Sequence, residues 1–320
     1  MLPKFLAKKK LLSTILIPFS WIYSLLGIIR KIISKELRLP GYVICVGNAT
    51  IGGTGKTQLV KWLAQKLQTN YKIVVITKAY GTNLRKAVWV EAQSAQEVGD
   101  ESKLLSAYTK VIAAPNPIAA LELITSYKPE IIIFDDGMQN PSFHKDLIIL
   151  TVNASRGFGN RRIIPAGPLR QSLKTAIAAA DISIFIGETI YLEEKELFDK
   201  KPFCAQIKPR NIKLDGEYLA FAGISNPEGF FALLRQYNVI VKLTKIFPDH
   251  YNYSEKDLHD LQQIAKQHNL ELITTEKDYV KIGAKVKKLH YLLVDLELDP
   301  LEEQKLLEEI QCHLNKNITK

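Results

Sequence analysis

Short, continuous apolar runs alternate with amphipathic segments along the chain from residue 41 onward. In the first half these runs lie at residues 42–46, 71–77, 111–114, 130–136, 147–152 and 182–186. Continuous apolar runs predict strands that are buried on both faces, and such strands are typical of a largely parallel sheet. A second group of runs lies at residues 218–224, 239–247, 270–275 and 290–296, with helical patterns between them. The pattern therefore predicts an α/β protein with two groups of strands.

A polar, lysine-rich stretch at residues 193–203 separates the two groups of runs. We therefore expect a change of domain near residue 205. The larger domain would cover residues 39–205, and a smaller α/β domain would cover residues 206–320. A chain of 320 residues is long enough for two domains of ordinary size.

The first 38 residues follow a different pattern. Leu11–Ile29 contains no charged residue, and 19 residues are at the lower edge of what spans a bilayer. Pro18 weakens the segment as a span, whereas Trp21 suits a membrane interface. Three interpretations stay open: a helix lying in or dipping into the inner leaflet, a single span, and a helix buried against the rest of the protein. We expect the first, a membrane-associated helix within residues 1–38, without a removed signal peptide.

The formal net charge of +10 is concentrated in the same region. Residues 1–38 hold eight lysines and arginines against Glu36 alone, and the rest of the chain is nearly balanced. Nucleic-acid binders spread their basic residues with aromatics between them, whereas here the charge flanks one apolar segment. We therefore expect an anionic membrane surface as a partner and no nucleic acid. Nothing in the sequence indicates an obligate protein partner.

The overall composition, with 47% hydrophobic and 24% charged residues, is that of a globular protein. The three cysteines are far apart and form no CxxC pair. This spacing suggests a reducing compartment and no structural zinc.

The most specific chemical signal is GNATIGGTGKT at residues 47–57. It follows an apolar run and precedes a helical pattern, which is the order of a P-loop. The glycines would let backbone N–H groups approach phosphate oxygens, and the helix would point its positive dipole end at them. Lys56 would reach the β- and γ-phosphates, and Thr57 would bind Mg²⁺. The expected nucleotide-binding residues are Thr50, Gly52, Gly53, Thr54, Gly55, Lys56 and Thr57. The strict pattern has glycine in place of Thr50, and the alternative is an ordinary glycine-rich turn.

Asp135 and Asp136 end the apolar run at residues 130–136. A P-loop enzyme needs a second Mg²⁺ contact from the carboxyl end of a neighbouring strand. We therefore expect these two carboxylates to bind the metal. The alternative is a helix cap or a turn that closes the strand.

Three further polar positions lie where chemistry is needed but where simpler explanations also hold. Asp100 stands before a helical pattern, where it could act on an acceptor hydroxyl or only cap the helix. Arg170 ends the run RRIIPAGPLR, which we expect to form a rigid, exposed turn that presents a cation to acidic groups, or else a plain connection. His250 follows a strand of the second group and is either structural or catalytic.

Several motifs in a fixed order resemble one family, the tetraacyldisaccharide 4′-kinases, from the apolar N-terminus to about residue 281. The matching segments are GNATIGGTGKT, TKAYG, VGDES, FDDGMQN, GFGNRRIIPAGPLRQ, FAGISNPEGFF, FPDHY and TTEKDYVK. The resemblance implies a RecA-like P-loop domain, a smaller α/β domain, and a peripheral or monotopic position at the cytoplasmic face of the bacterial inner membrane. It also implies transfer of the γ-phosphate of ATP, with Mg²⁺, to the 4′-hydroxyl of a tetraacylated glucosamine disaccharide 1-phosphate. The product would be the lipid IVA precursor of lipopolysaccharide.

The resemblance also implies roles for single residues. Asp100 is similar in position to the base that activates the acceptor hydroxyl, and His250 is linked to that aspartate. Lys56 is expected to take part in catalysis, and Asn48 and Arg170 are expected to contact the substrate.

The chain departs from the family pattern at several positions near these motifs. It has Lys78 and Ala79 where the family usually has arginine and glycine, and Asn140 where it has histidine. Lysine keeps the charge but lacks the planar guanidinium with which arginine makes bidentate contacts. None of these changes touches Lys56, Asp100 or His250, and activity is still expected.

Two other functions compete with a lipid kinase. A membrane-associated P-loop switch ATPase would couple nucleotide turnover to a protein or membrane partner. A soluble small-molecule kinase would not need the first 38 residues. The lipid kinase is the function that we expect, because a lipid acceptor accounts for both the P-loop and the apolar, basic N-terminus.

Overall fold

The computed structural model describes residues 11–187, 192–210 and 213–318. Residues 1–10, which hold four lysines of the expected membrane-associated segment, lie outside the described residues. The α-helices are α2 (Leu11–Ile15), α3 (Ile17–Ile33), α4 (Lys56–Leu67), α5 (Ala95–Val98), α6 (Asp100–Ser106), α7 (Leu121–Tyr127), α8 (Leu173–Ala178), α9 (Pro227–Gln236), α10 (Glu255–Gln267), α11 (Glu276–Ile282) and α12 (Pro300–Ile318). The strands are β1 (Tyr42–Asn48), β2 (Ile73–Lys78), β3 (Val88–Trp89), β4 (Val111–Ala114), β5 (Ile131–Asp135), β6 (Leu147–Asn153), β7 (Ile182–Ile186), β8 (Phe203–Pro209), β9 (Glu217–Ala222), β10 (Ile240–Ile246), β11 (Glu271–Thr275), β12 (Leu289–Leu292) and β13 (Val294–Leu298).

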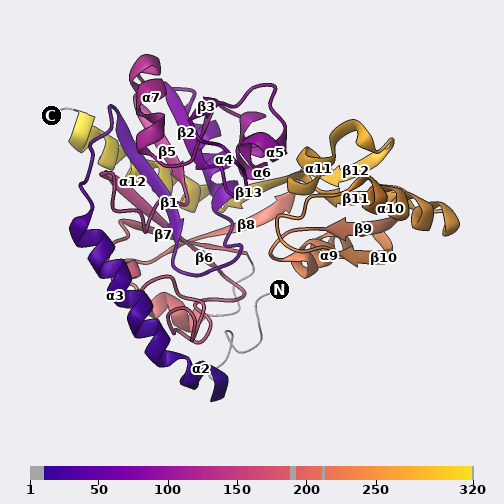
Figure 1. Cartoon of the computed structure of the whole chain (residues 1–320), viewed down its shortest axis with the longest axis horizontal. Helices are drawn as coiled ribbons and strands as arrows, with labels where there is room; N and C mark the ends of the chain where they lie inside the picture. Colours follow the sequence, from indigo (N-terminus) through magenta and orange to yellow (C-terminus); the bar gives the residue numbers. More distant parts are fainter. Residues whose placement is uncertain (1–10, 188–191, 211–212, 319–320) are drawn as a thin grey trace.

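Two sheets organise the described residues (Figure 1). Nine strands form the larger sheet in the order β13-β8-β7-β6-β1-β5-β2-β4-β3. Its pairs are parallel except at the two edges, where β13 and β3 run antiparallel to their neighbours. The smaller sheet has the order β10-β9-β11-β12, and all of its pairs are parallel. The α/β class with a large, mostly parallel sheet and a second, smaller sheet is thus confirmed.

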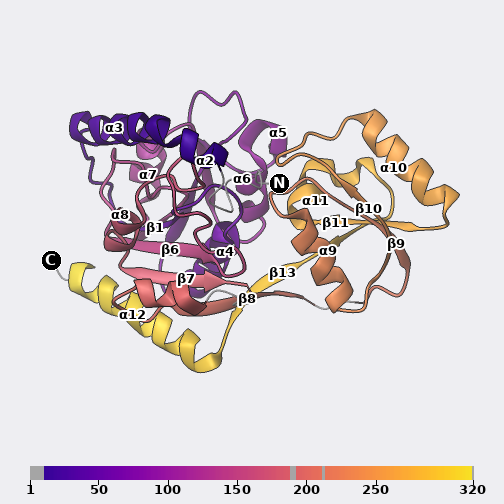
Figure 2. The ribbon, with the colours of Figure 1, turned by 90° about the horizontal axis from the view of Figure 1, so that it is seen from below.

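We call residues 217–292, which carry the smaller sheet with α9, α10 and α11, the small lobe, and the other described residues the large lobe. The chain leaves the large lobe after β8 and returns at β13 (Figure 2). The predicted single strand at 290–296 is therefore wrong, because β12 ends in the small lobe and β13 begins in the large one. The sequence prediction also missed β3, β8 and α12. The domain division near residue 205 stays a prediction.

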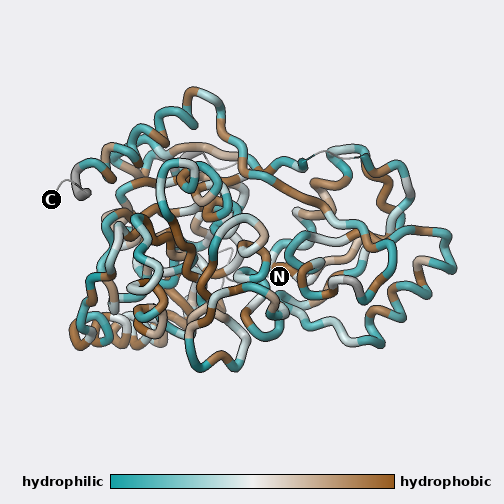
Figure 3. Tube along the Cα trace, turned by 90° about the horizontal axis from the view of Figure 1, so that it is seen from above, coloured by the Kyte–Doolittle hydropathy of each residue, from teal (hydrophilic) through white to brown (hydrophobic). Residues whose placement is uncertain are grey.

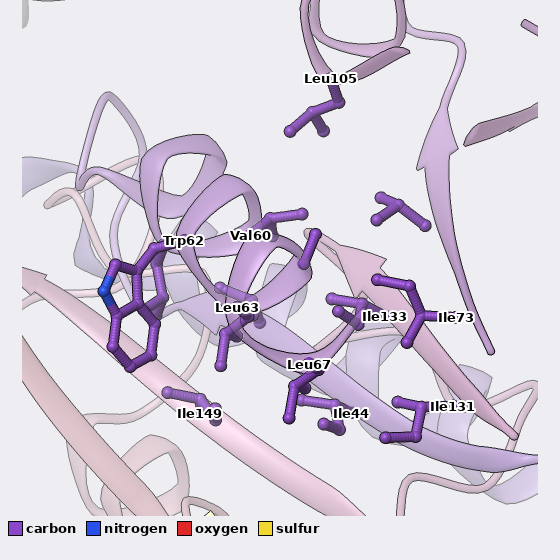
Figure 4. Close-up of a cluster of buried hydrophobic side chains, with 14 of the residues drawn as sticks. Ile44, Val60, Trp62, Leu63, Leu67, Ile73, Leu105, Ile131, Ile133 and Ile149 are labelled. Carbon is purple, nitrogen blue, oxygen red and sulfur yellow. The ribbon is translucent and has the colours of Figure 1, made fainter. Parts of the chain in front are cut away.

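The core of the large lobe explains why α4 is held firmly. Alternate residues of β1 point to opposite faces of the sheet, so that Ile44 joins the buried cluster under α4, α6 and α12, and Cys45 joins the cluster on the other face. Figure 4 shows Leu63 and Leu67 of α4 beside Ile44 and Ile131. Full burial of one such side chain stabilises the fold by roughly 1.5 to 3 kcal/mol. This packing fixes the N-terminal end of α4, where the glycine-rich loop lies.

Helix α3 lies on the outside of the large lobe, and Ser20 is its buried residue. Large apolar side chains along the helix are exposed, including Trp21 at 70% and Ile32 at 77%. Figure 3 shows hydrophobic segments along the strands of the large sheet and on the turns of α3. Among the described residues, none of the helices combines the length and the apolar character needed to cross a membrane.

Candidate active site

The glycine-rich loop between β1 and α4 has the local geometry of a phosphate cradle. Gly55 precedes α4 with φ +84°, and a Cβ on it would come within 2.9 Å of Ile186 on β7. A Cβ on Gly53 would come within 2.5 Å of the hydroxyl of Ser225, which belongs to the small lobe. Gly55 is required by its positive φ and by this contact, whereas Gly53 lets the loop and Ser225 approach each other closely. Helix α4 begins at Lys56 with its N-terminal N–H groups turned to the loop.

Hydrogen bonds from several segments hold this loop in shape. The hydroxyls of Thr54 and Thr151 lie 2.8 Å apart, and Thr151 donates to the carbonyl of Gly47. Asn48 is fully buried, and its Nδ2 donates to the carbonyl of Thr50 at 2.7 Å. Asn48 thus shapes the loop from inside, and its expected contact with a substrate stays a prediction.

The segment that contains Arg170 packs against the loop from the other side. The backbone N–H of Arg170 donates to the carbonyl of Ala49, and the N–H of Ile51 donates to the carbonyl of Pro168. Residues 166–169 are buried, so the expectation of an exposed turn is wrong. A Cβ on Gly167 would come within 2.2 Å of the carbonyl oxygen of Arg162, so glycine lets this run fold back tightly on itself. We call residues 161–170 the strap.

The strap also binds the N-terminal helices. Ser20 donates to the carbonyl of Ile163 at 2.7 Å and accepts from the N–H of Ala166 at 3.2 Å. Arg162 donates to the hydroxyls of Ser13 and of a neighbouring threonine. The strap therefore joins the exposed apolar helix α3 to the phosphate loop. The sequence did not predict this link, because Ser20 is one of several serines in an apolar run.

Thr57 and Asp135 lie together under the loop. The hydroxyl of Thr57 donates to Oδ2 of Asp135 at 3.2 Å, whereas Oδ1 of Asp135 is buried without a hydrogen-bond partner among the described residues. Burial, together with the charges of Glu101 and Asp136, raises the pKa of Asp135 above its usual range, and Lys56 opposes this. A buried carboxylate oxygen without a donor is a natural ligand for a cation. The pair fits Mg²⁺, which takes few protein ligands beside phosphate oxygens and water.

Asp136 points to the two cations of the site. Arg170 Nη1 lies 2.8 Å from Oδ1 of Asp136, and Lys56 Nζ lies 3.8 Å from Oδ2. Burial would raise the pKa of Asp136, but the charges of Lys56 and Arg170 outweigh it and lower the pKa. Asp136 has φ +62°, an uncommon conformation for a residue with a side chain. The carboxylate thus holds Lys56 and Arg170 beside the phosphate loop.

Asp100 and His250 meet across the two lobes. Asp100 is the first residue of α6, and His250 lies in the small-lobe loop after β10. Nδ1 of His250 lies 3.0 Å from Oδ2 of Asp100. Because a carboxylate only accepts hydrogen bonds, His250 carries its proton on Nδ1 here. Asp100 therefore does more than cap helix α6, because its carboxylate also binds a side chain of the other lobe.

The electrostatic surroundings keep Asp100 ionised. Burial would raise its pKa, but the hydrogen bond from His250 and the charges of Lys277 and Lys281 outweigh it and lower the pKa to about 2. The same hydrogen bond raises the pKa of His250, while burial and Lys277 oppose the rise. The pair is thus an ionised carboxylate with a polarised imidazole.

Lys277 belongs to this site and was not singled out in the sequence analysis, and it pairs there with Glu101, the neighbour of Asp100. Lys277 Nζ lies 3.1 Å from Oε1 of Glu101 and 3.7 Å from Oδ2 of Asp100. The lysine stands in the segment TTEKDYVK, which carries the family resemblance, and its place in that segment was the available signal. A lysine in the first turn of a helix otherwise looks like a solvent-exposed residue.

One groove of about 1960 Å³ connects these groups. It is lined by the phosphate loop, by Asp135, Arg170 and His250, and it extends to Tyr23 and Arg30 of α3. Asp100 is 7% exposed and lies in contact with His250 and Lys277, which line the groove. The site therefore combines a phosphate cradle, a candidate metal position and an ionised carboxylate with an apolar helix at its edge. Such a site can transfer a phosphoryl group to an amphipathic acceptor.

Comparisons with known proteins show similarity over most of the chain. The family model of the tetraacyldisaccharide-1-P 4′-kinase, LpxK, matches residues 12–315. The tetraacyldisaccharide 4′-kinase of Rickettsia bellii is 47% identical over 286 residues, which cover 88% of this chain and 89% of that protein. The enzyme of the same description from Rickettsia akari is 44% identical, with 93% of each chain covered. The crystal structure of the "apo" form of LpxK from Aquifex aeolicus in complex with ATP matches with a TM-score of 0.76 and 27% identity. That match covers 95% of this chain and 100% of the other.

Proposed function

The chain belongs to the tetraacyldisaccharide-1-P 4′-kinase family, and from this membership we propose how its residues carry out the reaction. Its function is that of a tetraacyldisaccharide 4′-kinase in lipid A biosynthesis. The donor would be ATP, since the related structure is a complex with ATP. The acceptor would be the 4′-hydroxyl of a tetraacyldisaccharide 1-phosphate, and the products would be ADP and lipid IVA.

The observation that carries this proposal is the contact between Asp100 and His250 beside the phosphate loop. A P-loop alone is common to many nucleotide-binding proteins. An ionised carboxylate that is held by a histidine of the other lobe is what an enzyme needs to accept a proton from a hydroxyl. The groove leads from this pair to α3, which supports an acceptor with a sugar head and acyl chains.

The phosphate loop would bind and orient the donor. Backbone N–H groups of the loop and of the first turn of α4 would surround the β- and γ-phosphates. Lys56 would leave its contact with Asp136 to neutralise charge that develops on the γ-phosphate. Arg170, which is held by Asp136 and by the strap, supplies a second positive charge at the same place.

Thr57 and Asp135 would hold Mg²⁺. The buried Oδ1 of Asp135, which has no hydrogen-bond partner among the described residues, supports this assignment. A bound Mg²⁺ would neutralise phosphate charge and orient the phosphate oxygens. The charges of Glu101 and Asp136 both act on Asp135. The hydrogen bonds of Asp136 to Arg170 favour a role in positioning the cations.

Asp100 would accept the proton of the acceptor hydroxyl. As the hydroxyl oxygen forms its bond to the γ-phosphorus, the bond between that phosphorus and the β–γ bridging oxygen breaks and ADP leaves. The hydrogen bond from His250 fixes the orientation of the carboxylate, and the cations around Asp100 keep it ionised before the reaction. Proton transfer late in the reaction is compatible with a carboxylate of low pKa.

The N-terminal helix would place the enzyme at its substrate. We propose that α3 lies in the cytoplasmic leaflet of the inner membrane, with its exposed apolar side chains among the lipids. Arg30 and Lys31 in its last turn would contact anionic head groups, each worth on the order of 1 kcal/mol near such a surface. The acyl chains of the acceptor could then stay in the bilayer while the sugar enters the groove.

A direct assay tests the proposal. The wild-type enzyme would be incubated with ATP labelled at the γ-position and tetraacyldisaccharide 1-phosphate in detergent micelles. The expected result is a lipid with a second phosphate, formed only when both substrates are present. Steady ATP hydrolysis without such a product, and without dependence on the disaccharide, would exclude the lipid kinase and favour a switch ATPase.

A further inference from the structure

The first turn of α11 is the principal contact of the small lobe with the carboxylates of α6. It is fixed by Thr275, whose hydroxyl accepts from the N–H of Asp278 and donates to the carboxylate of that residue. This cap directs Glu276 and Lys277 toward the large lobe. The turn is therefore a rigid element that presents two oppositely charged side chains across the contact between the lobes.

Glu276 binds side chains of the large lobe and so stabilises the contact between the lobes. It contacts Lys61, a fully buried residue of α4, at 3.7 Å, and it accepts a hydrogen bond from Tyr108, which follows α6. Lys61 also contacts Asp295 on β13 at 3.3 Å. This network holds α11 against the large lobe without any contribution from Lys277.

Lys277 instead reaches the two carboxylates at the start of α6. Its Nζ lies 3.1 Å from Glu101 and 3.7 Å from Asp100, and its side chain is 20% exposed. Placing a long, charged side chain in this position costs conformational entropy and hydration. The cost is offset because the ammonium group pairs with both carboxylates at once, and the charge of Glu101 also acts on Asp135.

Among the residues that the structure describes, the cations within 4 Å of Asp100 all come from the small lobe. His250 contacts it from the loop after β10, and Lys277 and Lys281 contact it from α11 at 3.7 and 4.0 Å. Glu101, its neighbour on α6, is the anion that shares Lys277. Separation of the lobes would thus remove all these cationic neighbours of Asp100 at once.

Lys281 differs from Lys277 in its main partner. Its Nζ lies 2.6 Å from Asp278 within the small lobe, and it stands over the ring of Tyr253. It is therefore chiefly a part of the small-lobe core. Lys277 is the lysine whose nearest partners both belong to the large lobe.

We propose that Lys277 is a positioning residue that couples closure of the two lobes to the arrangement of Asp100 and Glu101. With the lobes in contact, Lys277 pairs with both carboxylates, screens their mutual repulsion and fixes their orientation toward the groove. With the lobes separated, both carboxylates lose this partner and Asp100 also loses His250. This inference rests on the proposed function, because it assigns Lys277 a role in the same phosphoryl transfer.

The test compares Lys277→Met, which keeps the length of the side chain without its charge, with Lys277→Arg, which keeps the charge. Lys266→Met is the matched control, since Lys266 is an exposed lysine of the same lobe on α10. For each protein one would measure kcat, KM for ATP, the melting temperature, and the pH dependence of kcat/KM. Wild-type transfer to the disaccharide is the reference for all of them.

We expect Lys277→Met to lower kcat by about 10- to 100-fold, because a small displacement of the Asp100 carboxylate slows the reaction by such a factor. The KM for ATP should be unchanged. In the pH dependence of kcat/KM, the midpoint that reports the pKa of His250 should move to higher pH in Lys277→Met. The reason is that Lys277 opposes protonation of that imidazole. Lys277→Arg should recover part of the kcat and the wild-type midpoint. Lys266→Met should behave as the wild type.

Two outcomes would overturn the inference. In the first, Lys277→Met keeps the wild-type kcat and pH midpoint. In the second, both Lys277 variants lose activity in proportion to a lower melting temperature, which would indicate a merely structural lysine. A wild-type enzyme that forms no phosphorylated lipid would instead contradict the proposed function, so the two failures are distinguishable.

Discussion

His250 and Asp100 are 150 positions apart and belong to different lobes, yet Nδ1 of the histidine lies 3.0 Å from Oδ2 of the aspartate. Each is placed by a distinct local device: Asp100 begins α6 after Gly99, which has φ +91°, and His250 itself has φ +58°. Backbone conformations of this kind persist where the surrounding structure enforces them. The contact therefore depends on the lobes being together.

The first prediction concerns stability and pH. The pKa of His250 is raised in the folded protein, so its bond to Asp100 stabilises the fold below the unfolded pKa of about 6.5 and loses that effect as pH rises through the folded pKa. His250→Gln should therefore lower the melting temperature more at pH 6 than at pH 9. Melting curves of both proteins at the two pH values check this. An equal difference at both values would mean that the histidine is not protonated in the contact.

The second prediction concerns Lys56. Its side chain is 13% exposed and its counter-charge is Asp136, so its loss removes the cation closest to the phosphate loop. Lys56→Met should lower kcat by about 10²- to 10³-fold, as for the loss of a preorganised electrostatic contact to a transition state. Lys66→Met on the same helix is the control, because Lys66 pairs with Glu303 at the surface. A kinetic assay that finds both variants alike would contradict the assignment.

The third prediction concerns the metal. Asp135→Asn and Thr57→Val should bind ATP in the presence of EDTA as well as the wild type does, because the loop and Lys56 remain. Addition of Mg²⁺ should tighten ATP binding to the wild type but not to either variant. Calorimetric titration with and without Mg²⁺ measures this independently of turnover. If Mg²⁺ tightened binding equally in all three proteins, its ligands would lie elsewhere.

The fourth prediction concerns the attachment of α3. Ser20→Ala removes a hydroxyl that bonds to Ile163 and Ala166 of the strap and leaves both backbone groups without that partner. We expect a loss of about 1 to 3 kcal/mol, the cost of an unpaired buried polar group. Ser24→Ala is the control, since Ser24 bonds only within its own helix. Unfolding in detergent would measure the difference, and equal stability of the two variants would show that the strap does not anchor the helix.

The sequence predicts the elements that rest on local pattern. Residues 42–57 correctly indicate β1, the phosphate loop and the start of α4. The reason is that burial of a strand on both faces and the order of strand, turn and helix both depend on residues that are adjacent in the sequence. Asp135 and Asp136 were also placed at the end of a strand. The pattern could not separate β12 from β13, because both are apolar and only Leu293 lies between them.

Contacts between distant segments explain what the sequence could not predict. Ser20 looks like one of several serines on an apolar helix, and its burial follows from the strap that packs on it. The strap looked exposed because prolines and glycine are typical of turns, yet its small residues allow close packing. Lys277 reads as a solvated lysine, and its function as a partner of Asp100 and Glu101 exists only once the small lobe meets α6.

The most direct test of the account is single-turnover phosphate transfer by Asp100→Asn, with ATP binding measured on the same protein. Asparagine keeps the size of the side chain but cannot accept the hydroxyl proton. If Asp100 is the base, the variant should bind ATP as the wild type does, and its rate of transfer to tetraacyldisaccharide 1-phosphate should fall by about 10²- to 10⁴-fold. Transfer at the wild-type rate by a variant that binds ATP normally would contradict the assignment of Asp100 as the base.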